Sequence, residues 1–151
     1  MASNIRKAIT EKILRSKVLQ ELKWSEIAEK IGRSKEWTAT ACLGDACFDK
    51  NEAEKIGKLF SLNDEDIKWL QIVPHRNIIA DAELAKDPVM ARLKEAVGVY
   101  GPAMRELILE EFGDGIISAI NFDFKLEREP HDDGDRVKIT WSGKFLPYKK
   151  F

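Results

Sequence analysis

The 151 residues of the chain suit one domain or two small ones. Hydrophobic residues make up 44%, enough for a core, and 25 basic residues nearly balance 26 acidic ones. The formal net charge of -1 gives no general attraction to nucleic acid or anionic membranes. No apolar run is long enough to cross a bilayer, and the first residues lack the apolar segment of a secretory signal. We therefore expect a cytoplasmic protein.

The cysteines and histidines do not predict a metal site. Cys42 and Cys47 are close in sequence, whereas His75 and His131 lie far from them and from each other. A zinc site needs about four ligands, usually in paired spacings. Two reduced thiols, as is usual in the cytosol, are the better interpretation.

The first part of the chain, residues 1–73, predicts a bundle of five short helices. Apolar residues recur with helical spacing over residues 5–22. Each of the next four helices is expected to begin at a capping residue, and these residues are Ser25, Ser34, Asn51 and Asn63. Gly32 is expected to end the second helix, while the third reaches about Leu43 and the fourth reaches Phe60.

Residues 25–43 are typical of a helix-turn-helix unit, with Gly32 in the turn. A DNA reader needs basic residues on the face that meets phosphates. Residues 1–73 contain 13 basic and 12 acidic residues, so their net charge is +1. The second helix of the unit, over residues 34–43, has no Asn, Gln or Arg to contact base edges. We predict a bundle that does not bind nucleic acid, and the alternative is a transcriptional regulator with a C-terminal dimerisation domain.

A linker is expected over residues 74–86 and a second domain over residues 87–151. Asp87 followed by Pro88 is typical of a helix start, with aspartate as the N-cap. Because a proline cannot supply the helical N–H, Gly101-Pro102 is expected to interrupt this helix. The pattern thus predicts two helices, over residues 88–100 and 102–112.

Arg92 and Glu95 are three residues apart on the first of these helices, so they are neighbours on its surface. Most such pairs are solvated and contribute little to stability. Here Ala91 and Val99 flank the pair and give the helix a second apolar face. A helix with two apolar faces is covered on both sides, as at a subunit interface.

The run Ile116–Ile120 carries no charge and contains a single hydroxyl, that of Ser118. It follows a glycine turn at Gly113 and Gly115. Apolar groups that face water cost free energy, and a buried hydroxyl needs a partner. We interpret the run as buried backbone that presents Ser118 to a small anionic substrate held between subunits.

From Ile120 the apolar period changes to two, which predicts a strand. A turn is expected over residues 131–135, a second strand over residues 136–141, and another turn at Ser142-Gly143. A lone two-stranded hairpin is barely stable in water and has open edges. We therefore predict that the strands complete a sheet with another copy of the chain.

Together these residues resemble the cyanase family, whose members are also termed cyanate hydratases or cyanate lyases. The longest matching segment is residues 111–122, and shorter matches are residues 99–101 and 143–147. Asp87-Pro88 followed by Arg92 and Glu95 is similar to the catalytic helix of the family. The resemblance covers the whole chain. Many relatives carry aromatic residues at the positions of Ala91 and Lys94, and Gly98 and Pro102 are also unusual.

The resemblance implies an α+β, mostly α fold. Its N-terminal helical bundle resembles helix-turn-helix DNA-binding domains, and its C-terminal domain is a helix plus a β-hairpin whose strands interlace in a dimer. Five dimers would form a homodecamer with active sites between subunits. Arg92, Glu95 and Ser118 would be the catalytic residues.

The implied reaction is the bicarbonate-dependent decomposition of cyanate to ammonia and carbon dioxide through carbamate. It uses bicarbonate as co-substrate and needs no metal or organic cofactor. Such an enzyme would serve cyanate detoxification and nitrogen metabolism. A third interpretation is an oligomeric protein that binds small anions without catalysis.

Overall fold

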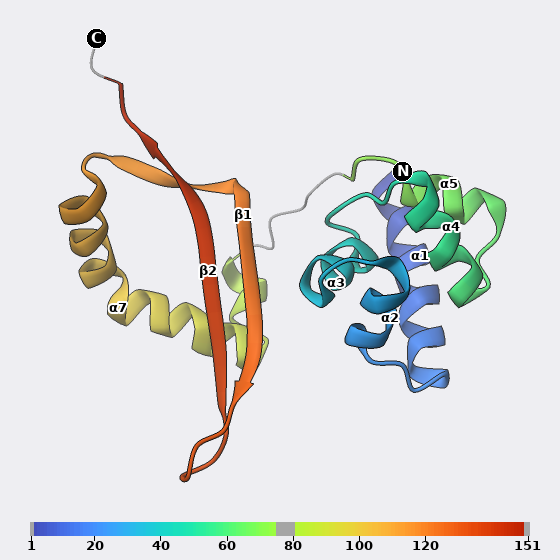
Figure 1. The fold of residues 1–151 in the computed structure, drawn as a ribbon, viewed down its shortest axis with the longest axis horizontal. Coiled ribbons are helices and arrows are strands. Elements are labelled where there is room, and N and C mark those ends of the chain that lie inside the picture. Colours follow the sequence, from blue (N-terminus) through green and yellow to red (C-terminus); the bar gives the residue numbers. More distant parts are fainter. Residues whose placement is uncertain (1, 75–80, 150–151) are drawn as a thin grey trace. The chain divides into compact units, whose positions relative to one another are not determined.

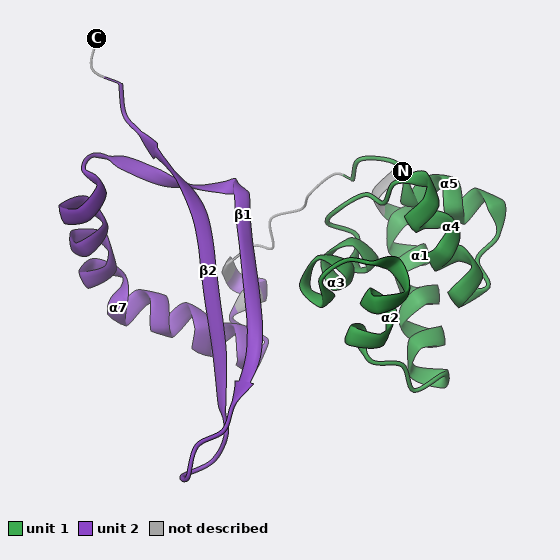
Figure 2. Ribbon diagram, viewed as in Figure 1, with its two compact units in different colours: residues 1–77 green, residues 78–151 purple. Residues whose placement is uncertain are grey.

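The structure, a computed structural model, describes residues 2–74 and 81–149. The chain divides into two compact units, residues 1–77 and residues 78–151 (Figure 2). The first unit contains α1 (Ala2–Leu19), α2 (Trp24–Ile31), α3 (Lys35–Leu43), α4 (Lys50–Phe60) and α5 (Asp64–Leu70). The second contains α6 (Asp81–Leu84), α7 (Pro88–Phe112), β1 (Gly115–Glu129) and β2 (Arg136–Pro147) (Figure 1). The predicted α+β, mostly α fold is confirmed.

The first unit is a helical bundle with an apolar core. Its fully buried apolar side chains come from all five helices, and the largest are Ile9, Ile13, Ile27, Ile56 and Leu70. Burying one such side chain stabilises a fold by about 1.5–3 kcal/mol. The turn between α2 and α3 is as predicted, because Gly32 ends α2 in the left-handed region with φ of 83°. None of the described helices has the length and apolar character needed to cross a membrane.

Two of the four predicted caps are correct and two are wrong. Ser34 accepts a hydrogen bond from the Trp37 N–H at 3.1 Å, and Asn63 caps α5 in the same way. The cap predicted at Ser25 is wrong, because α2 already begins at Trp24. The cap predicted at Asn51 is also wrong. Asp49 caps α4 instead, because Asp49 and Glu52 each accept the other's backbone N–H, at 2.8 and 2.9 Å.

Arg6 ties α1 to the end of α3. Its Nη2 donates to the carbonyl oxygens of Ala41 at 2.7 Å and Ala46 at 3.1 Å. Burial lowers the pKa of the Arg6 guanidinium below its ordinary value. Cys42, in the last turn of α3, and Cys47 are free thiols. Burial raises the pKa of the Cys42 thiol to about 12, while the charge of Arg6 partly opposes this.

The predicted interruption at Gly101-Pro102 is wrong, because α7 is one helix of 25 residues with Pro102 inside it. Pro102 has no N–H for the carbonyl of Gly98, four residues earlier, so one hydrogen bond of the helix is lost. A proline at an interior position bends a helix, and α7 bends part-way along its length (Figure 1). Asp87 caps the start of α7 as predicted, with its carboxylate 2.9 Å from the Met90 N–H.

β1 and β2 form a two-stranded antiparallel sheet. The turn expected over residues 131–135 is present, but two other predictions are wrong. β1 begins at Gly115 instead of Ile120, and Ser142-Gly143 lies inside β2 instead of forming a turn. The alternation of apolar and polar residues could not predict the start of β1 or the continuation of β2 through Ser142-Gly143. The pairing of the two strands contains a bulge, and where a bulge starts and ends depends on the partner strand.

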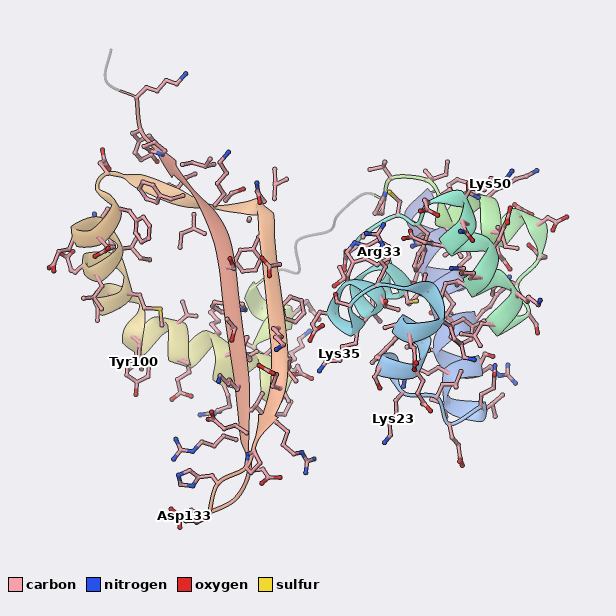
Figure 3. The ribbon with its side chains drawn as sticks, in the orientation of Figure 1. Lys23, Arg33, Lys35, Lys50, Tyr100 and Asp133 are labelled. Atoms are coloured by element: carbon pink, nitrogen blue, oxygen red, sulfur yellow. The ribbon has the colours of Figure 1, made fainter. Side chains whose placement is uncertain are left out.

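The second unit exposes most of its apolar side chains. No described side chain of α7 is buried, and Tyr100 projects from this helix (Figure 3). Exposed apolar residues of the hairpin include Ile120, Phe122, Val137 and Trp141. Ser118 is the one described residue of the unit that is buried. The described part of the second unit therefore has no buried apolar core, in contrast to the first unit.

Candidate active site

The N-terminal part of α7 carries Arg92 and Glu95. The Asp87 cap and Pro88 at the first helical position set the start of α7, so residues three apart on the next turns share one side. Arg92 Nη1 donates a hydrogen bond to Glu95 Oε2. The two side chains are 78% and 57% exposed. Among the described residues the guanidinium has no second hydrogen-bond partner, so its other N–H groups are available to a ligand.

Ser118 lies in the bulge of β1. Ile117 pairs with Phe145 and Phe122 pairs with Gly143, so the four residues from Ser118 to Asn121 face a single residue of β2. Ser118 Oγ accepts hydrogen bonds from the N–H groups of Ile120 at 3.2 Å and Asn121 at 2.9 Å. The hydroxyl therefore holds the bulge closed, and both of its lone pairs are used.

Our interpretation of Ile116–Ile120 as a buried run is correct only for Ser118 within one chain. Ser118 is 9% exposed, whereas its neighbours Ile117 and Ile120 are 46% and 97% exposed. The partner that the sequence left open for the Ser118 oxygen is the backbone of the bulge itself. The local signal is a serine whose side chain can accept hydrogen bonds from the backbone N–H groups two and three residues later, as in a serine turn.

A single chain brings together two of the three predicted residues. Arg92 and Glu95 form an ion pair on α7, and Ser118 lies on β1. Within the described part of one chain, the Ser118 hydroxyl forms no hydrogen bond with either of them.

A groove of about 530 Å³ separates the C-terminal half of α7 from the start of β1. Its lining is mostly apolar and includes Val97, Met104, Ile108, Leu109, Ile116 and Ile117. Arg92 and Glu95 do not line this groove. Its chemistry suits packing against apolar side chains better than binding of a small anion.

The described residues contain no group of three or more His, Cys, Asp or Glu side chains placed to hold a metal ion. His131 lies at the hairpin turn, where its Nε2 is 3.1 Å from Arg136 Nη2, and His75 lies outside the described residues. The functional groups of the candidate site are a guanidinium, a carboxylate and a hydroxyl.

Comparison with known proteins matches both units. The family profile "Cyanate hydratase, N-terminal" matches residues 6–74, and the profile "Cyanate lyase C-terminal domain" matches residues 82–150. A cyanate hydratase of Methylibium petroleiphilum is 53% identical over 143 residues, which cover 95% of this chain and 97% of that protein. The chain belongs to the cyanase family. The resemblance to this family that the sequence indicated is thereby confirmed.

Other members of the cyanase family agree. A cyanate hydratase of Polynucleobacter asymbioticus is 50% identical over 146 residues, covering 97% of this chain and 99% of that protein. The crystal structure of cyanase from T. urticae is similar with a TM-score of 0.77 and 31% sequence identity. That similarity covers 92% of this chain and 96% of the other, so the cyanase fold extends over both units.

Proposed function

We propose that this chain catalyses the bicarbonate-dependent decomposition of cyanate to ammonia and carbon dioxide through carbamate. Its membership of the cyanase family, with 53% identity to a cyanate hydratase over nearly the whole chain, carries the assignment of cyanate hydratase activity. The catalytic groups in this proposal are Arg92, Glu95 and Ser118.

Arg92 is the anion-binding group of the proposed site. Cyanate and bicarbonate are small anions with almost no apolar surface, so charge and hydrogen bonds must hold them. The exposed guanidinium can donate two parallel hydrogen bonds to a pair of carboxylate-like oxygens. Glu95 forms an ion pair with Arg92 and orients its guanidinium. In a site shared between subunits, Glu95 also offsets the positive charge of Arg92 side chains from neighbouring copies.

Ser118 is a hydrogen-bond donor in this proposal. Its lone pairs accept two backbone N–H groups, which leaves the O–H to donate to an oxygen or nitrogen of the bound anion. A nucleophilic serine needs an adjacent base, and no described histidine contacts Ser118. Holding the two anions together would supply at most roughly 7–11 kcal/mol of the barrier reduction.

The overall reaction consumes two protons. One cyanate, one bicarbonate and two protons give one ammonia and two molecules of carbon dioxide, with carbamate as the species that releases ammonia. A bicarbonate oxygen forms the new bond to the cyanate carbon, and the bond of that oxygen to the bicarbonate carbon then breaks, which releases the first carbon dioxide and leaves carbamate. The carbon–nitrogen bond of the carbamate breaks next and gives ammonia and the second carbon dioxide. The positive field of Arg92 lowers the mutual repulsion of the two anions as they approach.

The proposed site is completed between subunits of a homo-oligomer, a decamer of five dimers. Two observations support this. Ser118 does not meet Arg92 within the described part of one chain, and the second unit exposes its apolar side chains. We assign dimerisation and catalysis to residues 87–151, and a cytoplasmic location agrees with the free thiols Cys42 and Cys47.

The test is to mix the purified protein with cyanate, with and without bicarbonate, and to measure ammonia. Bicarbonate-dependent release is expected. Absence of release together with salt-sensitive DNA binding would favour the transcriptional regulator. Binding of anions without release would favour the non-catalytic anion-binding protein.

The surroundings of α3 weaken the regulator alternative. Arg33 Nε lies 2.5 Å from Glu52 Oε1, and the Arg33 guanidinium stacks over the Trp37 ring with 4.8 Å to the centroid. Lys35 Nζ lies 3.6 Å from Glu36 Oε1. Cations that are already paired with carboxylates release fewer counterions from a phosphate backbone, so they contribute less to DNA affinity.

A further inference from the structure

Gly143 of β2 lies opposite the end of the bulge in β1. It pairs with Phe122, the first β1 residue after the bulge, and Lys144 is the single β2 residue that faces the four bulged residues. Gly143 is therefore the β2 residue at which the regular ladder resumes beside Ser118.

A side chain at Gly143 would collide with both ends of the bulge. A Cβ at this position would lie 2.3 Å from Ile117 Cγ2, 2.9 Å from a ring carbon of Phe122, and 3.1 Å from the Ser118 carbonyl oxygen. Ile117 is branched at Cβ, so its Cγ2 moves only if χ1 or the backbone moves. The Ser118 carbonyl is backbone. Any residue other than glycine would therefore push the bulge away from β2.

The shape of the bulge determines where the Ser118 hydroxyl points. Its oxygen is held by the N–H groups of Ile120 and Asn121, both within the bulge, so the direction of the remaining O–H follows their positions. We infer that Gly143 is a positioning residue, which leaves the space that lets the bulge aim the Ser118 hydroxyl at the bound anion. This inference rests on the proposed function and extends it from Ser118 to a glycine on the other strand.

The experiment is a double-mutant cycle on the full-length protein, with Gly143→Ala, Ser118→Ala and both changes together. The readouts are kcat and KM for cyanate and the affinity for azide, a linear three-atom anion, measured by calorimetry. We expect Ser118→Ala to lower kcat/KM roughly 10²-fold, and Gly143→Ala to lower it by about 10- to 100-fold. In the Ser118→Ala background, Gly143→Ala should change kcat/KM or azide affinity by no more than about twofold.

The matched control is Gly98→Ala. A Cβ at Gly98 has no neighbour within 4 Å among the described residues, so this variant should keep wild-type kcat/KM. Equal effects of Gly143→Ala with and without the Ser118 hydroxyl would overturn the inference, because a general structural fault acts independently of that group. Wild-type activity of Gly143→Ala would overturn it as well.

Two outcomes are distinguished from failure of the inference itself: an inactive wild-type protein, and a Gly143→Ala variant that does not fold. If the wild-type protein releases no ammonia from cyanate, the proposed function fails before any variant is compared. If Gly143→Ala alone does not fold, the cycle is run in an Ile117→Ala background, which removes the nearest clash. Additive effects of Gly143→Ala and Ser118→Ala in that background would overturn the inference in the same way.

Discussion

The guanidinium of Arg92 is a planar fork that lysine cannot reproduce, although lysine keeps the positive charge. If the fork holds a pair of anion oxygens, Arg92→Lys should lower kcat/KM roughly 10²-fold with the assembly unchanged. Steady-state ammonia release and sedimentation would measure both properties. Arg128→Lys is the matched control, because Arg128 also forms an exposed ion pair, 2.9 Å from Asp135, at the far end of the hairpin. Near-normal turnover of Arg92→Lys would remove Arg92 from the mechanism.

The two thiols should react at very different rates. Because burial raises the pKa of Cys42 to about 12, its thiolate is rare at pH 8, while the half-buried Cys47 is more accessible. We expect iodoacetamide to modify Cys42 roughly a thousandfold more slowly than an ordinary thiol. Raising the pH should speed the reaction of Cys42 by about tenfold per unit up to pH 11, since the thiolate fraction still rises there. Mass spectrometry of the folded protein would test this, and equal labelling of both cysteines at pH 8 would contradict it.

At the residue scale, the sequence predicts those side-chain contacts that depend only on the spacing of residues within one element. The pairing of Arg92 with Glu95 follows from helical geometry alone, and the structure contains it. The hydrogen bonds of Ser118 could not be predicted with the same ease. They depend on a bulge, and the bulge depends on how residues 115–129 pair with residues 136–147 across the turn.

At the scale of the helix, the N-cap of α4 can be tested by mutation. The structure places it at Asp49, whereas the sequence pattern predicted Asn51, two residues later. Asp49 accepts the Glu52 N–H at 2.8 Å, so Asp49→Ala should lower the free energy of unfolding by about 1 kcal/mol. Asn51 lies inside α4, so Asn51→Ala should change it by less than about 0.5 kcal/mol. Urea denaturation followed by tryptophan fluorescence would measure both variants. A larger loss in Asn51→Ala than in Asp49→Ala would show that the cap lies elsewhere.

The element boundaries that were wrong share one physical cause. Asp49 and Asn51 are both good N-caps in isolation, and each has a glutamate three residues later, so the local pattern does not decide between them. Likewise Pro102 removes one hydrogen bond from α7, but residues on both sides continue the helix, so it bends instead of ending. Local propensity therefore predicts that an element exists more securely than where it starts or ends.

At the scale of the whole molecule, the two units differ in how they are stabilised. The bundle buries Ile9, Ile13, Ile27 and other side chains within one chain. Over residues 81–149 the second unit shows no such core, and within this range both edges of its two-stranded sheet are unpaired. The expectation that the strands complete a sheet with another copy came from this count of strands alone. The structure adds which apolar side chains are available for such a contact.

Assembly through the hairpin can be tested with two neighbouring positions of β2. Trp141 is 55% exposed and shares its face with Val137 and Ile139, whereas Thr140 points to the other face. If the apolar face is covered by a second copy, Trp141→Asp buries an unpaired charge there, which costs several kcal/mol.

We expect Trp141→Asp to sediment as a monomer at micromolar concentration and to lose ammonia release, because Arg92 and Ser118 of neighbouring subunits are then no longer brought together. Thr140→Asp should assemble and turn over cyanate like the wild type. A monomeric wild-type protein that still releases ammonia would exclude a site shared between subunits.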